Sequence, residues 1–437
     1  MSDDAFERAM GALAADARLW SDFEALCDCG GRVAGSESER RGLALVERLL
    51  GNVGGGEASS ETVPYAGWHG RGASLEIVRP RGVVVPLVAN PLVGAQPTPA
   101  AGVTGEVIDL GRGTPEQFTE NRADIAGRIV LVSHEYPFAA GHIHRRRKYN
   151  AAMEAGATGF IISNPVPGIG PTCGSSGRGG GAGIPALATD FESGALLRAG
   201  GGMRPIARMR LAGDDAPATT QVVLLDIPGT GPQRVVLSAH VDGHDLAESA
   251  MDNGSGVAAA IAIARAFAPH VAALPRGLRV CLFSAEEWAL AGSKAYLDAM
   301  DAAERSRLVL NVNLDTVAGG SRLTALTSGF PALDTFVQDA TRSVGLPIGT
   351  YRPLMQNSDH YNFAQHGIPA LRLVTGFDDA GSNVRYILTP ADTRDKVAPS
   401  ELKSAAIAAA AIVWRGLTAG DDELAALARR PAVAPGA

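Results

Sequence analysis

The sequence has few cysteines, few aromatic residues, no excess of basic charge and no long apolar run. Four cysteines among 437 residues are too few for a disulfide framework, so we expect them to be reduced and structural. There are 39 basic against 46 acidic residues, and this net charge of −7 gives no basis for binding nucleic acid or anionic membranes. The longest apolar run, residues 405–414, is about half of a membrane span.

The first residues also lack the pattern of a secretion signal. Residues 1–20 are acidic and amphipathic, whereas a signal peptide has a basic segment followed by an apolar one. We therefore expect a cytoplasmic protein without a membrane anchor. Alanine-rich helical faces permit a homo-oligomer but do not require one.

The composition of the chain differs between its middle and its two ends. Its length also predicts at least two domains, at about 150 residues per domain. Residues 73–213 contain short β-rich runs separated by glycine and proline, such as GRIVLVS and GIPALAT. Residues 1–72 and 214–420 have the composition of an α/β domain. We therefore predict an α/β domain that is interrupted by residues 73–213, with residues 421–437 as a C-terminal tail.

The α/β part alternates apolar strands with helices. The strand sequences RVVLSAH, LRVCLFSA and LVLNVNLD are separated by predicted helices over 254–267 and 292–300, and a last helix covers 401–417. Such alternation favours a mixed, mostly parallel sheet with helices on both faces. Ligands of these folds bind at the carboxyl ends of the strands, so the side chains there are the first candidates for function.

Acidic or imidazole side chains follow three of these strands. His240 ends one strand, Glu286 and Glu287 follow the next, and Asp315 follows a third. Asp252 lies in a glycine-containing turn before a helix, and its two oxygens can bridge a pair of cations. Such groups are costly to bury without cations, and histidine nitrogen and carboxylate oxygen are zinc ligands. The sequence therefore predicts a metal centre.

The neighbours of these residues suggest separate roles. Asp242 lies two residues after His240 and is predicted to orient the imidazole ring. Glu286 suits a general base beside a metal-bound water, and Glu287 suits a metal ligand. Each motif alone is more often structural than catalytic, but their order along the chain favours a hydrolytic centre.

These motifs resemble those of the co-catalytic zinc aminopeptidase and glutamate carboxypeptidase family. The matching segments are His240-Val-Asp242, Asp252-Asn-Gly-Ser-Gly256, Glu286-Glu287, Gly292-Ser293-Lys-Ala-Tyr296, Asn313-Leu-Asp315 and Ser358-Asp359-His360. The resemblance implies that His240, Asp252, Glu287 and Asp315 bind metal, that Glu286 is the base and that His360 is a pocket residue. The inserted segment resembles a protease-associated domain, which covers the catalytic cleft in relatives.

The closing motif departs from that family. Relatives have Tyr-His-Thr-Pro-x-Asp-Thr, but this chain has Tyr386-Ile-Leu388-Thr-Pro-Ala-Asp392-Thr, and leucine cannot bind zinc. In the family, the missing histidine shares one metal with the residue that matches Glu287. The residues that match His240 and Asp315 hold the other metal, and the one that matches Asp252 spans both. One metal site is thus expected to be intact, while its neighbour lacks a ligand.

Three outcomes follow from the missing ligand. The first choice is a single-metal hydrolase of small amide or peptide substrates that uses His240, Asp252 and Asp315, with Glu286 as base. The second is a two-metal exopeptidase in which another donor replaces the lost histidine. The candidate donors are His244, His360, Asp392, His142 and His144. The third is a non-catalytic binding protein on the same fold.

The expected cofactor is zinc, as one or two ions, or another divalent metal. The expected substrate is a small peptide, an N-acyl compound or an aminoacyl compound. If the second position holds no metal, Glu287 is free to pair with a substrate ammonium group. The basic run over 142–148 could meet a substrate carboxylate, although such runs are more often solvated surfaces. Asn357, Arg352 and Tyr386 flank the last motifs and are further candidates for the pocket wall.

Overall fold

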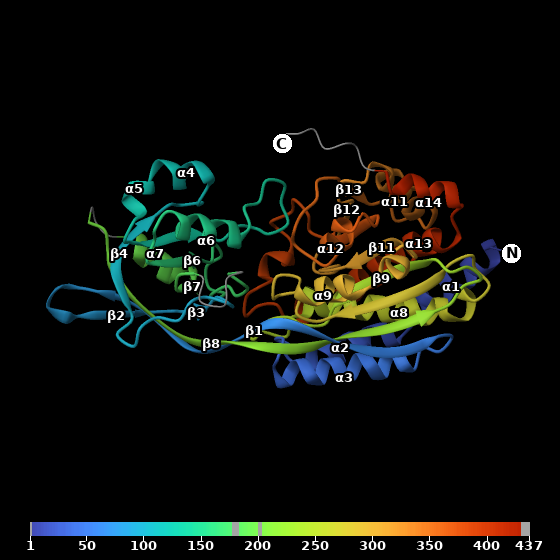
Figure 1. Cartoon of the computed structure of the whole chain (residues 1–437), viewed down its shortest axis with the longest axis horizontal. Coiled ribbons are helices and arrows are strands. Elements are labelled where there is room, and N and C mark those ends of the chain that lie inside the picture. Colours follow the sequence, from blue (N-terminus) through green and yellow to red (C-terminus); the bar gives the residue numbers. More distant parts are fainter. Residues whose placement is uncertain (1, 177–182, 200–202, 430–437) are drawn as a thin grey trace.

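The computed structural model describes residues 2–176, 183–199 and 203–429, which form two lobes side by side (Figure 1). The larger lobe contains the N-terminal helices and the C-terminal half, and the smaller lobe contains the middle of the chain. Two long antiparallel strands, β1 (Glu57–Val78) and β8 (Ile206–Ile227), run through both lobes. The predicted domain boundaries after residues 72 and 213 fall inside these strands, so continuous sheet pairing joins the lobes.

The larger lobe is built on a mostly parallel sheet. Its central strands are β9 (Arg234–His240), β10 (Gly277–Phe283), β11 (Leu308–Leu314) and β14 (Ala370–Thr375). They lie in the order β14-β11-β9-β10, and each adjacent pair is parallel. Antiparallel strands flank them, with β8 beside β10 and β12 (Leu323–Leu326) beside β14, and β13 (Gly349–Tyr351) extends the edge. The predicted fold class is confirmed.

Helices surround this sheet. They are α1 (Ser2–Ala15), α2 (Arg18–Asp28), α3 (Glu37–Gly51), α8 (Ser255–Val271), α9 (Ala291–Ala299), α10 (Ala302–Arg305), α11 (Pro331–Ser343), α12 (His360–Gln365), α13 (Pro399–Thr418) and α14 (Asp421–Leu427). Short turns of helix are η2 (Ala250–Gly254), η3 (Asn383–Tyr386) and η4 (Arg394–Lys396). The predicted helices over 254–267, 292–300 and 401–417 correspond to α8, α9 and α13.

Helix α8 is apolar on all sides because it lies in the core, where it packs against α1, α2, α13 and β9. The stretch Ala250–Val271 is apolar and long enough to cross a bilayer, but 83% of its most apolar part is buried inside the fold. Its hydrophobicity is therefore accounted for by packing. The four cysteines are buried free thiols, as the sequence predicted.

The smaller lobe continues the sheet through β8 and β4 and has its own hydrophobic core. Its elements are η1 (Pro80–Gly82), β2 (Val84–Leu87), β3 (Asn90–Pro91), β4 (Val103–Asp109), α4 (Pro115–Glu120), α5 (Arg122–Ile125), β5 (Ile129–Ser133), α6 (Arg145–Glu154), β6 (Gly159–Ser163), β7 (Ala186–Thr189) and α7 (Phe191–Arg198). Strands β4 to β7 pair in parallel. Phe138 and Cys173 belong to this part of the sequence but pack into the core of the larger lobe.

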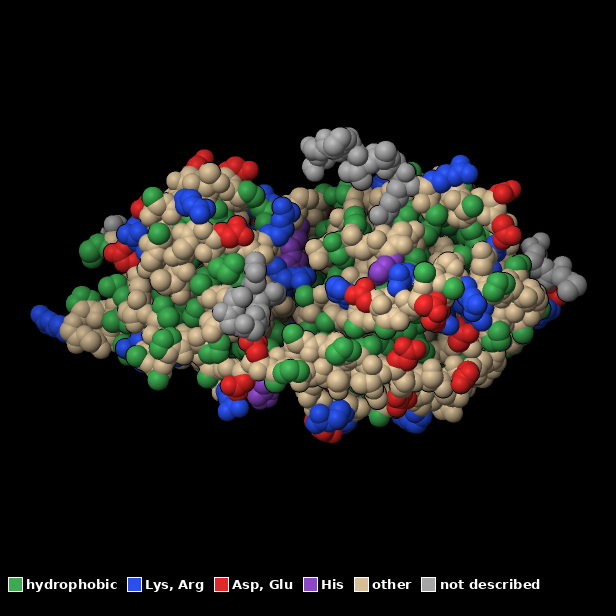
Figure 2. Space-filling view, in the orientation of Figure 1, with side chains coloured by type: hydrophobic (Ala, Val, Ile, Leu, Met, Phe, Trp, Pro, Cys, Tyr) green, Lys and Arg blue, Asp and Glu red, His purple; other side chains and the backbone are tan. Residues whose placement is uncertain are grey.

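The two lobes meet along the loop that carries Leu388. The Asp378 N–H donates to the Phe138 carbonyl at 2.8 Å, and the Cys173 N–H donates to the Leu388 carbonyl, also at 2.8 Å. The Tyr136 hydroxyl donates to the Gly376 carbonyl. Figure 2 shows basic and histidine side chains in the hollow between the lobes. The inserted lobe is therefore fixed against the carboxyl edge of the parallel sheet.

Candidate metal centre and active site

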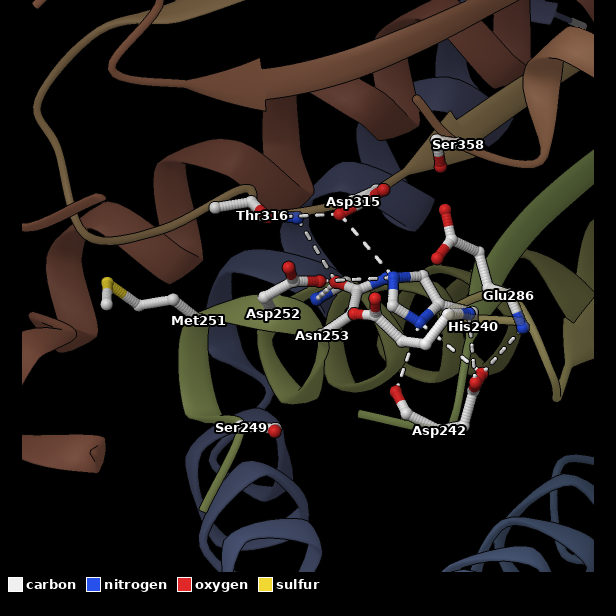
Figure 3. Close-up of polar contacts among 12 residues, drawn as sticks. His240, Asp242, Ser249, Met251, Asp252, Asn253, Glu286, Asp315, Thr316 and Ser358 are labelled. Carbon is white, nitrogen blue, oxygen red and sulfur yellow. Dashed lines mark hydrogen bonds and ion pairs between the residues drawn. The ribbon is translucent and has the colours of Figure 1, made fainter. Parts of the chain in front are cut away.

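Three of the four residues predicted to bind metal, His240, Asp252 and Asp315, meet at this edge of the sheet (Figure 3). His240 is the last residue of β9, Asp315 directly follows β11, and Asp252 lies in the irregular turn η2. His240 Nε2 lies 3.2 Å from Asp252 Oδ1 and 3.6 Å from Asp315 Oδ1. Parallel strands bring their carboxyl ends to one edge, which explains why residues far apart in the sequence converge.

The His240 ring is fixed through its other nitrogen. Nδ1 lies 3.1 Å from the Asp242 backbone carbonyl and 3.6 Å from Asp242 Oδ1. A proton on Nδ1 is donated there, which leaves the Nε2 lone pair for an ion. Nε2 is buried and has no hydrogen-bond partner in the part of the chain that the structure describes. An orphaned imidazole nitrogen facing carboxylates fits a metal ligand.

Asp242 also binds the turn after β10, a contact that the sequence did not predict. Its carboxylate accepts hydrogen bonds from the backbone N–H groups of Glu286 and Glu287, both at 3.1 Å. It therefore ties the turn after β10 to the end of β9. This contact holds the two glutamates beside His240.

The acidic and imidazole side chains form two adjacent groups. In each group, one possible ligand atom per residue lies within 4.8 Å of the others. The first group is His240, Glu286 and Asp315, and the second is His244, Asp252 and Glu287. Because Asp252 Oδ1 also lies next to His240, Asp252 is placed to connect the two groups.

The carboxylates crowded at this edge of the sheet favour the binding of cations or protons. Burial raises the pKa of Glu286 well above its usual value, and the nearby charges of Glu287 and Asp315 raise it further. Burial would lower the pKa of His240, but the carboxylates of Glu286 and Asp315 outweigh it and raise that pKa well above normal. Protons are thus favoured where negative charge is crowded and desolvated. A divalent cation relieves the same repulsion, so these residues fit a metal site.

Arg372 is a buried neighbour of Asp315. Its guanidinium lies 3.0 Å from Asp315 Oδ1, and both side chains are only 2% exposed. Burial raises the pKa of Asp315, but Arg372 and His240 outweigh it and hold that pKa below its usual value. Asp315 therefore stays ionised. Sequence reasoning missed this residue, although an arginine in the apolar strand PALRLVT was a usable signal.

The turn that carries Asp252 is held by amide and carboxylate side chains. The Asp252–Asn253 peptide bond is cis, and Asn253 Oδ1 accepts hydrogen bonds from the N–H groups of Gly256 and Thr316. Asp392 accepts from the N–H groups of Met251 at 2.8 Å and Asp252 at 3.3 Å. Asp392, one of the candidate replacement ligands, therefore supports the turn.

Arg32 is a second residue that sequence reasoning missed. It is fully buried, and its guanidinium donates to five backbone carbonyls. Three of these carbonyls, those of Val241, Glu248 and Ser249, lie in the loop after β9. Arg32 thus fixes the loop that carries His244 and leads to Asp252. No short motif marks it, because its acceptors are backbone groups.

The remaining candidates for the lost ligand lie in other settings. Leu388 lines the cavity above the metal residues and is 8% exposed. His144 caps α6 through its Nδ1, which accepts from the Arg146 N–H at 3.1 Å. His142 also lines the cavity, and His360 is fully buried at the start of α12. Within the described ranges, His244 is the candidate that joins Asp252 and Glu287 in one group.

Part of the basic segment over 142–148 lines the cavity, namely His142, His144, Arg145 and Arg146, so its interpretation as a solvated surface is wrong for most of its residues and holds for Arg147. Arg145 is 5% and Lys148 is 1% exposed. Lys148 Nζ lies 2.6 Å from Glu135, and Arg145 Nε donates to the Ser175 carbonyl at 3.0 Å. Arg146 and Asn357 also line the cavity, whereas Arg352 pairs with Asp334. The sequence could not show this burial, because the partners Glu135 and Ser175 lie outside the segment.

A buried histidine and several carboxylates at the carboxyl edge of a parallel sheet fit the metal centre of a hydrolase. Residues 222–413 match the model of peptidase family M28, and residues 85–197 match that of the PA domain. The chain therefore contains one region similar to family M28 peptidases and one similar to the PA domain, and it is a metal-dependent peptide hydrolase. The alternative of a non-catalytic binding protein is set aside.

Individual relatives agree with this assignment. Aminopeptidase YwaD of Bacillus subtilis is 27% identical over 74% of this chain and 69% of its own length. Carboxypeptidase Q of Bos taurus is 23% identical over 86% of this chain and 80% of its own length. The solved structure of BSAP, a zinc aminopeptidase from Bacillus subtilis, is 22% identical, with a TM-score of 0.71 over 94% of this chain and 95% of its own. This last similarity shows the fold.

Proposed function

We propose that the protein is a zinc-dependent exopeptidase of the aminopeptidase type that acts on small peptides. The observation that carries this proposal is the position of Glu286. Its carboxylate is buried beside His240 and Asp315 and has no hydrogen bond or ion pair among the residues that the structure describes. Such a carboxylate is available to take a proton. The aminopeptidase relatives support the choice of reaction, and BSAP supports the choice of metal.

Each residue of the centre has a stated task in this proposal. His240, Asp252 and Asp315 would hold a zinc ion, which when bound polarises the scissile carbonyl and makes a water molecule more acidic. Glu286 takes a proton from that water and delivers it to the leaving amine nitrogen. Asp242 fixes the backbone of Glu286, and Arg372 keeps Asp315 ionised.

A carboxylate in the substrate is the second part of the proposal. Arg146 lines the cavity, and its guanidinium has no hydrogen bond or ion pair within the described residues. Burial lowers the pKa of Arg146, while the charges of Glu286 and Glu287 oppose this shift. A positive group of this kind favours substrates with a free carboxyl terminus, such as dipeptides and N-acyl amino acids.

The proposed pairing of Glu287 with a substrate ammonium group is less well supported than the carboxylate contact. Glu287 Oε1 lies 2.9 Å from His244 Nε2, so an ammonium group would have to displace this contact. Equal turnover of free-amine and N-acetylated substrates would refute the pairing of Glu287 with a substrate ammonium group. The cytoplasmic location and a homo-oligomer also remain proposals, which cell fractionation and light scattering can check.

Activity measurements on matched peptides test the proposed function. The purified protein should hydrolyse short peptides, lose this activity with a chelator and regain it with zinc. Within one peptide series, a free carboxyl terminus should be preferred over the corresponding amide. A protein that holds no divalent ion, and whose hydrolysis is unaffected by chelation, would refute the metal mechanism. Equal kcat/KM for acids and amides would refute only the role of Arg146.

A further inference from the structure

We propose that His244, Asp252 and Glu287 form a second metal site, in which His244 replaces the imidazole that the closing loop lacks at Leu388. This inference rests on the proposed function, because it assumes that the first site holds a zinc ion. Such a site would allow a chain without the closing histidine to hold two ions. The nitrogen ligand would come from the loop of His244 and not from the loop of Leu388.

One pair of atoms in the second group lies at a separation that fits two ligands of one ion. His244 Nε2 lies 2.9 Å from Glu287 Oε1, and the chosen ligand atoms of all three residues lie within 4.8 Å of one another. Two zinc ligands with bonds of about 2.0 Å at the tetrahedral angle lie about 3.3 Å apart. The measured separation is close to that value.

The contact of His244 with Glu287 is an ion pair without hydrogen-bond geometry. His244 is only 7% exposed, and its Nε2 lies 2.9 Å from Glu287 Oε1 but has no partner with hydrogen-bond geometry in the described part of the chain. Imidazole nitrogen and carboxylate oxygen are both zinc ligands. An ion shared by His244, Glu287 and Asp252 satisfies the nitrogen and both carboxylates together.

The loop that presents His244 is fixed independently of any ion. The His244 N–H donates to Ser249 Oγ at 2.9 Å, and Arg32 holds the carbonyls of Val241, Glu248 and Ser249. Gly31 packs directly on this loop, since a Cβ at that position would lie 1.5 Å from the His244 carbonyl oxygen. The backbone that carries His244 is therefore held in place before metal binds, which lowers the entropy lost on binding.

Leu388 and His244 are linked through one thiol. The Leu388 carbonyl accepts from the Cys173 N–H at 2.8 Å and from Cys173 Sγ at 3.2 Å. Cys173 also interacts with His244 through electrostatics. Cys173, which comes from the inserted lobe, thus lies between Leu388 and the replacement ligand.

Zinc content measured by elemental analysis tests this site separately from activity. The full-length protein is stripped with a chelator, reconstituted with zinc alone and freed of excess metal. We expect about two zinc ions per chain in the wild type and about one in His244→Ala. His366→Ala is the matched control, because His366 pairs with Asp298 away from the centre, and it should keep about two.

A rescue variant keeps the test decisive if His244→Ala folds poorly. In His244→Ala/Leu388→His the family's donor is restored at its usual position, and about two zinc ions should bind again. Cobalt-loaded samples give a second readout, since visible absorption per chain should fall by about half in His244→Ala and recover in the double variant. Circular dichroism checks that each variant is folded.

The outcomes separate this inference from the proposed function. About one zinc ion in an active wild type, or two retained in folded His244→Ala, would overturn the second site and leave the hydrolase intact. Two zinc ions in a wild type that cleaves no peptide would support the second metal site and refute the proposed peptidase activity.

Discussion

The two halves of the metal centre are held in different ways. His240 and Asp315 lie at the ends of adjacent parallel strands, whose pairing sets their separation. His244 and Leu388 lie on loops that other side chains hold in place. Moving a strand-end ligand would require a change in the sheet, whereas a loop ligand can be exchanged for a neighbour. The half that departs from the family is the half that depends on loops.

The largest effect should come from the strand-held half. His240→Ala removes the nitrogen ligand of the first site, and we expect kcat/KM to fall by about 10³-fold or more, since a metal ion contributes several kcal/mol to the transition state. Steady-state kinetics on a cleaved dipeptide measures this loss. His244→Ala is the comparison and should retain more activity. A larger loss in His244→Ala would reverse the ranking of the two halves.

Glu286→Gln separates chemistry from metal binding in the same half. Loss of the proposed base should lower kcat by at least about 10²-fold while zinc content stays at the wild-type value. Elemental analysis and kinetics on one protein sample check both parts. Full activity in this variant would remove Glu286 from the mechanism.

The loop-held half should be the more sensitive to its supports. Arg32→Met removes five hydrogen bonds to backbone carbonyls, three of them buried, so we expect the free energy of unfolding to fall by about 3–5 kcal/mol. Denaturant unfolding measures this change. Arg40→Met, at an exposed position with a surface ion pair, should change stability by less than about 0.5 kcal/mol. Equal stability of the two variants would show that Arg32 does not hold the loop.

The contribution of the inserted lobe should be smaller and specific to the substrate. Arg146→Ala should raise KM by about 10-fold for a peptide with a free carboxyl terminus, because a charge-assisted hydrogen bond is worth about 1.5–3 kcal/mol. The matching peptide amide should be unaffected. Arg147→Ala, at the exposed neighbouring position, is the control. The same KM change for acid and amide would argue for a structural role.

The smallest effect should be a pH dependence of stability in the inserted lobe. Burial lowers the pKa of His142 from 6.5 to about 4, so the unfolded chain binds its proton more readily than the folded chain does. His142 therefore contributes stability above pH 6.5 that is lost as the pH falls toward about 4, at most about 3 kcal/mol. Thermal unfolding of metal-free wild type and His142→Asn across this range should diverge. Parallel curves would contradict the assignment.

Much of the metal centre could be predicted from the sequence, because polar residues at the ends of apolar strands are easy to recognise. His240, Glu286 and Asp315 each follow an apolar strand, and parallel pairing then brings them together. His244 could only be one of five candidate donors, since no periodicity shows how a loop folds. Arg32 and the buried basic segment were missed or misread for the same reason: their contacts come from chain segments far away in sequence.

The sequence by itself determined the alternation of strands and helices, the inserted domain and the acidic strand ends, because these depend on local composition and spacing. It also showed that the closing loop offers leucine where a nitrogen donor was expected. Only the tertiary structure decided which histidine faces Glu287 and that Arg146 lines the cavity. Loop positions are set by hydrogen bonds between distant residues, such as those of Arg32 and Cys173, and no local pattern encodes them.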